Sequence, residues 1–228
     1  MSASEKTFAW LRFVALSGRE GEQWSEAFGH VRPLVRLCAQ SVVDLRRGGA
    51  PEKSLDMLRC AREGLDTLDA GTDAAVRPAA DRFYYGALGY YFYTRRALEE
   101  ADDSMSRAHH AIVQAVGRHR WLVPMAYDCY ELRMHRARIA RDRFRWSEMR
   151  EHAEESAGMR AGRSPLCLLS DGTPIALADV RRFYESLPLT DDDREALWWI
   201  VDEDQGSREA ARFVRSMFRL SGFVIQYA

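Results

Sequence analysis

Seven aromatic side chains lie within one eleven-residue segment of the chain. They are Phe83, Tyr84, Tyr85, Tyr90, Tyr91, Phe92 and Tyr93. At about 100° per residue these side chains cover more than one face of a helix, so some can pack in a core while others face elsewhere. Tyrosine joins an apolar ring to a polar hydroxyl and is enriched at protein interfaces. The segment predicts either an aromatic groove for a partner or a central helix that is buried on both sides.

A run of arginines follows further along the chain, with only Asp142 and Glu148 opposing it. It comprises Arg133, Arg136, Arg138, Arg141, Arg143, Arg145 and Arg150. Guanidinium groups bind carboxylates and phosphates through paired hydrogen bonds, so the run predicts a positive patch for an acidic peptide or a nucleic-acid backbone. Phe144 and Trp146 stand among these arginines, where aromatic rings can stack on bases. The alternative is a solvated face balanced by the acidic run from Glu99 to Asp103.

Catalytic and metal-binding patterns are weak in comparison. Asp128, Glu131 and His135 share a helical face at i, i+3 and i+7, but the repeated Glu-x-x-His pattern of di-iron bundles is missing, and we interpret them as surface partners of the arginines. The chain has no Gly-rich phosphate loop and no nucleophile elbow. The sequence therefore predicts no catalytic residue, no metal and no cofactor, and an enzyme in a helical bundle is the least favoured of three hypotheses.

The four cysteines Cys38, Cys60, Cys129 and Cys167 are scattered, with no C-x-x-C pair, and we expect buried, reduced thiols. The chain has 33 basic and 34 acidic residues, so it is nearly neutral. This balance is typical neither of a protein that binds nucleic acid through its overall charge nor of an acidic disordered tail. All but two of the basic residues are arginines. No apolar stretch approaches membrane-spanning length, so we expect a cytoplasmic protein that does not enter a membrane.

The elements that must position these residues are helices up to about residue 161. Leu34, Leu37, Cys38, Val42 and Leu45 form one apolar stripe, which Gly48, Gly49 and Pro51 separate from the next helix. Further helices are expected around residues 55–68, after Gly71 and Pro78, over 97–112, around 122–129 and over 146–159. Six helices in pairs, with a period of about 40 residues, predict an α-solenoid of about three helical hairpins.

The middle hairpin carries a more specific pattern of large and small residues. Tyr85, Leu88, Gly89, Phe92, Ala101, Met105 and Ala108 stand at the spacing of the tetratricopeptide-repeat (TPR) signature, which this segment resembles. The resemblance implies that Tyr85, Leu88 and Phe92 pack within the repeat. It also implies a concave surface lined by Phe83, Gly86, Tyr90, Tyr93 and Thr94. Residues 1–163 are accordingly predicted to form a TPR-like array.

Residues 164–228 have a different character and are predicted to form a small second module. An apolar run from Leu166 ends in Asp171-Gly172, which predicts a tight turn. Three short helices and a terminal strand over residues 223–227 follow in the sequence pattern. This inventory resembles a winged-helix module of the PCI type, and its helices also resemble the helix-turn-helix of sigma-factor region four. The expected fold class is mainly α, with a winged-helix-like α+β module at the C-terminal end.

Two functional hypotheses follow from these patterns. The first is a non-catalytic scaffold or adaptor that binds a partner peptide or helix by aromatic anchoring and arginine contacts to carboxylates. Its predicted contact residues are Tyr90, Tyr93, Tyr127, Tyr130 and Arg133. The second is a nucleic-acid-binding regulator that uses the C-terminal module and a basic patch. That patch consists of Arg136, Arg138, Arg141, Arg143 and Arg145. The sequence predicts neither the identity of the partner nor the oligomeric state.

Overall fold

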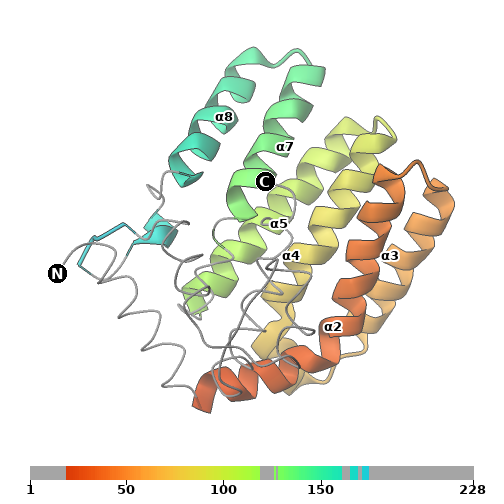
Figure 1. Ribbon diagram of the computed structural model, residues 1–228, viewed down its shortest axis with the longest axis vertical. Coiled ribbons are helices and arrows are strands. Elements are labelled where there is room, and N and C mark those ends of the chain that lie inside the picture. The colour runs from red at the N-terminus through yellow and green to blue at the C-terminus, as the bar shows by residue number, and fades with distance from the viewer. Residues whose placement is uncertain (1–18, 119–125, 127, 161–164, 169–170, 175–228) are drawn as a thin grey trace, which may run out of the picture. The chain divides into compact units, whose positions relative to one another are not determined.

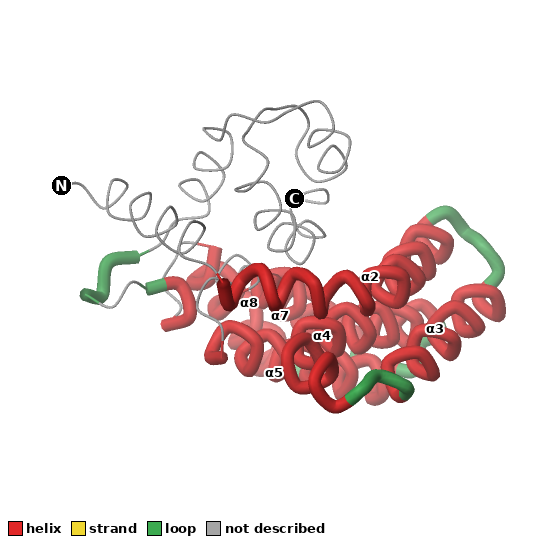
Figure 2. Tube along the Cα trace, turned by 90° about the horizontal axis from the view of Figure 1, so that it is seen from below, coloured by secondary structure: helices red, strands yellow, loops and turns green. Residues whose placement is uncertain are grey.

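The computed structural model describes residues 19–118, 126, 128–160, 165–168 and 171–174. These residues are almost entirely helical (Figure 1), which confirms the mainly α prediction. The helices are α2 (Arg19–Arg46), α3 (Pro51–Asp66), α4 (Ala70–Thr94), α5 (Leu98–Arg118), α7 (Asp128–Asp142) and α8 (Trp146–Arg160), followed by a 3-10 turn at Pro165–Cys167. Figure 2 shows helices joined by short loops, and the residues drawn in colour there contain no strand.

The chain divides into two compact units. One comprises Glu26–Ala115 and Leu132–Glu154, and the other comprises Met1–Ser25, Val116–Glu131 and Glu155–Ala228. The first unit, which we call the hairpin unit, holds the paired helices α2–α3, α4–α5 and α7–α8 around their connecting turns. None of the helices described has the length and apolarity that crossing a membrane requires.

The three hairpins have the same turn. Gly48, Arg96 and Phe144 each have a positive φ, of 75°, 60° and 60°, and they follow one another at intervals of 48 residues. In each turn the next amide donates to the carbonyl five residues back: Gly49 to Asp44 at 2.8 Å, Ala97 to Phe92 at 3.0 Å and Arg145 to Ala140 at 2.8 Å. This bond closes a helix through a left-handed residue. The interval is longer than the predicted period of about 40 residues because α4 and α5 have 25 and 21 residues.

The second helices of the first two hairpins bury residues at the same spacing of i, i+4, i+7 and i+11. They are Ser54, Leu58, Ala61 and Leu65 in α3, and Ala101, Met105, Ala108 and Ile112 in α5. Close approach within the second hairpin depends on Gly89, where an added Cβ would lie 3.0 Å from Met105 Cγ and 3.2 Å from the Ala101 carbonyl oxygen. In the first hairpin the Ser54 hydroxyl donates to the Ser41 carbonyl at 3.2 Å. The small residues that the sequence pattern picked out at positions 89 and 101 thus do bring the helices together.

The sequence pattern predicted that the aromatic helix begins after Pro78, but the structure places its start earlier. Pro78 is buried inside α4, which begins at Ala70. The start is set by Asp69, whose Oδ1 accepts hydrogen bonds from the amides of Gly71 and Thr72, both at 3.0 Å. A side-chain cap satisfies amides at the helix N-terminus that have no partner within the helix, so it fixes this end eight residues before the proline.

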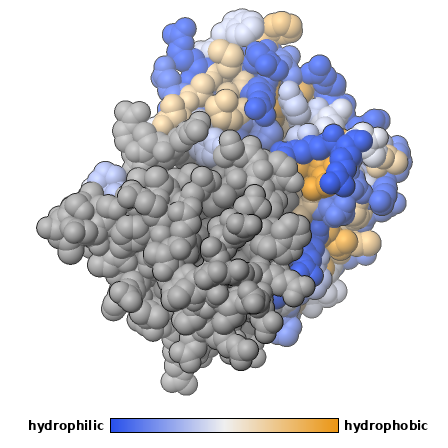
Figure 3. Space-filling view, in the orientation of Figure 1, coloured by the Kyte–Doolittle hydropathy of each residue, from blue (hydrophilic) through white to orange (hydrophobic). Residues whose placement is uncertain are grey.

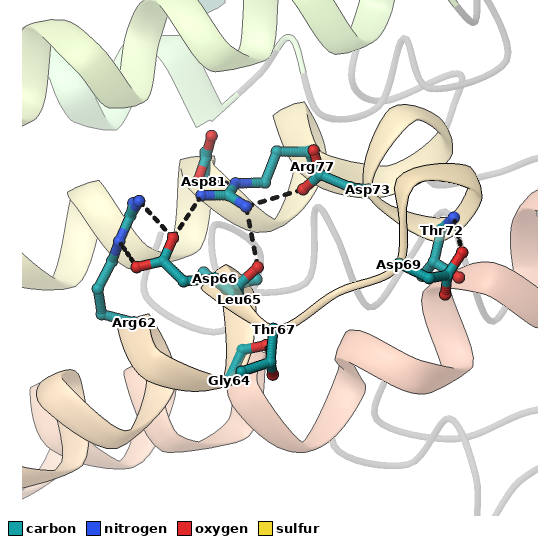
Figure 4. Close-up of polar contacts among 10 residues, drawn as sticks. All are labelled: Arg62, Gly64, Leu65, Asp66, Thr67, Asp69, Thr72, Asp73, Arg77 and Asp81. Carbon is teal, nitrogen blue, oxygen red and sulfur yellow. Dashed lines mark hydrogen bonds and ion pairs between the residues drawn. The ribbon is translucent and has the colours of Figure 1, made fainter.

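An ion-pair network joins α3 to α4 (Figure 4). Arg77 donates to Asp73 at 2.8 Å, to Asp81 at 2.9 Å and to the Leu65 carbonyl at the end of α3 at 2.9 Å. The same guanidinium lies 3.3 Å from Asp66, which also pairs with Arg62 at 2.6 Å. Burial raises the pKa of Asp81 even though Arg77 lies beside it. The network therefore holds the second hairpin on the first.

The predicted tight turn near the C-terminal end of the described residues is present. Leu168 and Pro174 form an isolated antiparallel bridge, Gly172 has a φ of 79°, and Asp171 Oδ1 accepts a hydrogen bond from the Thr173 amide at 3.0 Å. The expected winged-helix-like helices and the terminal strand fall within residues 175–228, outside the described residues.

Candidate functional site

Tyr90 lies at the centre of an aromatic and cationic cluster built by three helices. The Arg46 guanidinium at the end of α2 lies 5.3 Å from the centroid of the Tyr90 ring on α4. His135 on α7 meets the same ring edge to face, with 5.9 Å between ring centroids. Tyr90 and His135 are half-buried, whereas Arg46 and Arg138 are exposed. We call Arg46, Tyr90, His135 and Arg138 the Tyr90 cluster.

The lowered pKa of His135 shows that the Tyr90 cluster is a half-buried and positively charged environment. Burial, together with the positive charges of Arg138, Arg46 and Arg82, lowers the pKa of His135 to about 4. His135 is therefore neutral near pH 7, because burial and the neighbouring positive charges both disfavour its protonated form. Sequence analysis placed His135 among surface residues that pair with arginines. Its half-buried position against Tyr90 corrects that interpretation.

Arg82 contributes to this positive field from inside the fold. Arg82 is only 5% exposed, and its guanidinium lies 5.2 Å from the centroid of the Phe83 ring. An added Cβ at Gly86 would lie 2.6 Å from Arg82 Nη1, so the missing side chain at this position makes room for the guanidinium. Phe83 and Gly86 are buried, which corrects the prediction that they line an open concave surface.

Tyr93 is engaged in a contact between helices. Its hydroxyl donates to Asp142 Oδ2 at 3.2 Å, and Arg96 donates to the same oxygen at 2.8 Å. Arg141 Nε donates to Asp142 Oδ1 at 2.9 Å. These bonds lower the pKa of Asp142, chiefly through Arg141. Tyr93 thus helps to fix α7 on the second hairpin. The sequence analysis predicted Tyr93 only as a contact residue for a partner, and not this structural role.

The remaining predicted contact residues lie elsewhere. Arg133 on α7 lies with Nη1 3.2 Å from His152 Nδ1 on α8. Because a guanidinium only donates, Nδ1 of His152 accepts this bond. Tyr130 belongs to the other unit, where its carbonyl accepts a hydrogen bond from the Ser156 hydroxyl at 3.0 Å. Tyr127 lies outside the described residues.

The basic patch is mostly neutralised within the hairpin unit. Arg136 pairs with Asp102 at 2.7 Å, and Arg143 pairs with Glu99 at 2.6 Å. Arg141 pairs with Asp142 at 2.7 Å and Arg145 with Glu148 at 3.4 Å. In the part of the chain that the structure describes, Arg138 has no carboxylate within ion-pair distance. The geometry favours a face balanced by the acidic start of α5. Arg138, whose positive charge acts on His135 of the Tyr90 cluster, is the arginine of the patch without such a carboxylate among the described residues.

Other chemistry-bearing residues do not converge. Over residues 19–118 and the later described segments, no three His, Cys, Asp or Glu side chains stand close enough to hold a metal ion. Cys38 and Cys129 are buried and form no disulfide, and burial raises the pKa of Cys38 to about 12. Cys60 is exposed, which corrects the expectation that the cysteines are buried.

Neither the hydropathy of the surface nor comparison with known proteins indicates a particular function. Figure 3 shows hydrophilic and hydrophobic residues interspersed over the coloured part of one face. Comparison with protein-family models, curated proteins and solved structures finds no match to this chain. The Tyr90 cluster and the repeated hairpins are therefore the features of this chain that indicate a function.

Proposed function

We propose that this protein is a non-catalytic scaffold of TPR-like helical hairpins that binds an acidic peptide or helix of a partner at the Tyr90 cluster. The observation that carries the proposal is the half-buried Tyr90 ring in contact with both Arg46 and His135, with the exposed Arg138 acting electrostatically on His135. A tyrosine fixed in this way is an aromatic anchor that loses little conformational entropy on binding. The arginines add fork contacts to carboxylates.

Two further features support a repeat protein of this kind. The turns at Gly48, Arg96 and Phe144 have the same geometry at equal intervals, and α3 and α5 bury residues at the same helical spacing. Arrays of stacked hairpins form extended surfaces that bind peptides. The pairing of Arg136, Arg141, Arg143 and Arg145 with carboxylates weighs against the second hypothesis, since these are four of the five arginines assigned to nucleic acid.

The test is binding of the full chain to a fluorescein-labelled helical peptide with glutamates on one face and Leu and Trp on the other. We expect Arg138→Glu and Tyr90→Ala each to weaken binding by about tenfold. The matched control is Arg59→Glu, a charge reversal at an exposed arginine of α3, which should change affinity by about twofold or less. The circular-dichroism melts of both binding variants should stay close to that of the wild type.

Three results would contradict the proposal. Equal weakening by Arg138→Glu and Arg59→Glu would show that charge alone, rather than the Tyr90 cluster, drives binding. A collapsed melt of Tyr90→Ala would make Tyr90 a core residue. Tighter binding to single-stranded nucleic acid than to the peptide, with a steep loss of affinity in salt, would favour the nucleic-acid hypothesis.

A further inference from the structure

Three ion pairs join the second hairpin to the third. Three positions of the second hairpin hold the first helix of the third: Arg96 donates to Asp142 at 2.8 Å, Glu99 pairs with Arg143 at 2.6 Å, and Asp102 pairs with Arg136 at 2.7 Å. The first lies in the turn and the other two on the first turns of α5. They form the surface of the second hairpin that receives the third.

The equivalent positions of the third hairpin are all exposed. Counted at the interval of 48 residues, they are Phe144, Ser147 and Arg150. Phe144 is 77% exposed, and the neighbouring Trp146 is 57% exposed. The two rings meet edge to face with 6.2 Å between centroids. Arg96 and Glu99 of the second hairpin are exposed as well, but each has an ion-pair partner on the third hairpin. The third hairpin instead ends in an exposed apolar and cationic surface, which we call the α7–α8 end.

The backbone at Phe144 gives an independent reason to regard this surface as functional. A bulky residue with a positive φ is uncommon, and the left-handed region costs about 1 kcal/mol relative to glycine. The first hairpin uses Gly48 at this position. The second uses Arg96, whose side chain gains an ion pair there. A phenylalanine kept in this conformation with its ring in solvent fits a residue that is selected for contact with a partner.

We propose that the α7–α8 end receives an amphipathic helix of another protein, packed as α7 packs against the second hairpin. An apolar side chain of that helix would cover Phe144 and Trp146. Arg150 stands where the second hairpin has Asp102, so the sign of the charge is reversed, and the helix would carry a carboxylate where α7 carries Arg136. This inference is independent of the Tyr90 cluster.

A protein partner fits this surface better than a membrane does. Glu148 and Glu151 are exposed on α8, two and five residues after Trp146. An anionic lipid surface repels carboxylates, whereas a protein helix can match both signs of charge. Exposed Trp and Phe beside arginine are also the residue types that dominate binding energy in protein interfaces.

The experiment uses a labelled peptide that repeats residues 128–145 of this chain with three substitutions. Arg136→Glu faces Arg150, Asp142→Leu faces Phe144, and Arg143→Ala faces Ser147. The peptide with the unchanged sequence is the control, because its arginine would oppose Arg150. We expect the full-length protein to bind the recoded peptide at least about tenfold more tightly than the control peptide. Arg150→Glu in the protein should reverse this preference, and Phe144→Ser should weaken binding of both peptides.

The proposal is overturned if the two peptides bind equally, or if Arg150→Glu leaves the preference unchanged. It is also overturned if the protein sediments as a dimer that Phe144→Ser converts to monomer, because a second copy would then cover this end. Binding to phosphatidylserine vesicles that is lost in Phe144→Ser, without peptide binding, would identify a membrane as the occupant. The variants Tyr90→Ala and Arg138→Glu separate the two proposals, since neither should alter binding of the recoded peptide.

Discussion

Tyr93 on α4 donates a hydrogen bond from its hydroxyl to the carboxylate of Asp142 at the end of α7, at 3.2 Å. Arg96 and Arg141 donate to the same carboxylate, so one acidic group joins the second hairpin to the third. Burial, followed by the negative charge of Asp142, raises the pKa of Tyr93, whose hydroxyl stays protonated over the physiological range. The hydrogen bond from Tyr93 to Asp142 requires this protonated hydroxyl.

Replacing Tyr93 by Phe should therefore lower the free energy of unfolding by about 1 kcal/mol, the value of one hydrogen bond. Asp142→Ala should cost more, because it removes the common acceptor of three donors. Urea unfolding followed by circular dichroism measures both effects. If Tyr93→Phe instead weakened binding of the acidic peptide at unchanged stability, the hydroxyl would be a partner contact, as the sequence pattern first suggested.

Arg77 should be the most sensitive residue of the junction between the first two hairpins. Arg77→Ala leaves Asp73, Asp81 and the Leu65 carbonyl without their donor, and we expect a loss of about 2 kcal/mol in the free energy of unfolding. Arg59→Ala, which removes a solvent-exposed ion pair on α3, is the matched control and should cost about 0.5 kcal/mol or less. Equal losses in the two variants would show that the network in Figure 4 adds nothing beyond an ordinary surface pair.

The helices were predictable from sequence where local physics decides them. Gly48, Gly49 and Pro51 predicted the first turn, because a left-handed residue and a following proline both act within a few residues. The turns at Arg96 and Phe144 gave no such signal, since neither residue favours a positive φ. Their geometry follows from the packing of the paired helices, which no local pattern encodes.

The candidate site was only partly predictable for a related reason. Tyr90 was identified because aromatic clustering is visible in sequence. Its neighbours Arg46 and His135 are separated from it by more than 40 residues, so their convergence is a property of hairpin stacking. The sequence offered the acidic run from Glu99 to Asp103 as an alternative partner of the arginines, and Arg136 and Arg143 do pair with Asp102 and Glu99. Sequence alone did not decide between this balance and a free positive patch, because the two charge runs lie on different helices.

Gly89 tests the close approach within the second hairpin. Gly89→Val should lower the free energy of unfolding by about 2 kcal/mol, since its side chain would meet Met105 and the Ala101 carbonyl. Gly29→Ala, at a helical glycine of α2 with no atom within 4 Å of an added Cβ, should instead stabilise the protein by up to about 1 kcal/mol. Thermal unfolding of the two variants distinguishes contact from helix propensity. A stabilised Gly89→Val would show that the helices separate freely at this crossing.

The conformation of Phe144 leads to an unusual expectation for a phenylalanine. Phe144→Gly should raise the free energy of unfolding by about 1 kcal/mol, because glycine adopts a positive φ without steric cost. Gly48→Ala should have the opposite effect and similar size at the equivalent turn. Phe144→Gly also removes the ring, so it should weaken binding of the recoded peptide, as Phe144→Ser should, while its stability measured in urea rises. Loss of stability in Phe144→Gly would show that the ring packs on the fold.

The histidine of the Tyr90 cluster should make stability depend on pH. The pKa of His135 is about 4 in the folded chain and about 6.5 when unfolded, so below pH 6.5 the unfolded state binds a proton that the folded state does not. Stability contributed by this group is therefore full above about pH 6.5 and falls as the pH is lowered toward 4, by at most about 3 kcal/mol. The cause is burial together with the positive charges of Arg138, Arg46 and Arg82.

His135→Gln removes the titrating group and should flatten this part of the pH profile, measured by urea unfolding at pH 7, 5.5 and 4.5. Asp142 and Asp69, whose pKa values are lowered, lose their contributions only at more acidic pH and should behave alike in both proteins. Arg138→Ala should leave part of the slope, because it removes one of the three charges and little of the burial. An imidazole that titrates near pH 6.5 by NMR would mean that His135 lies in solvent, and the positive field around Tyr90 would then lose its main support.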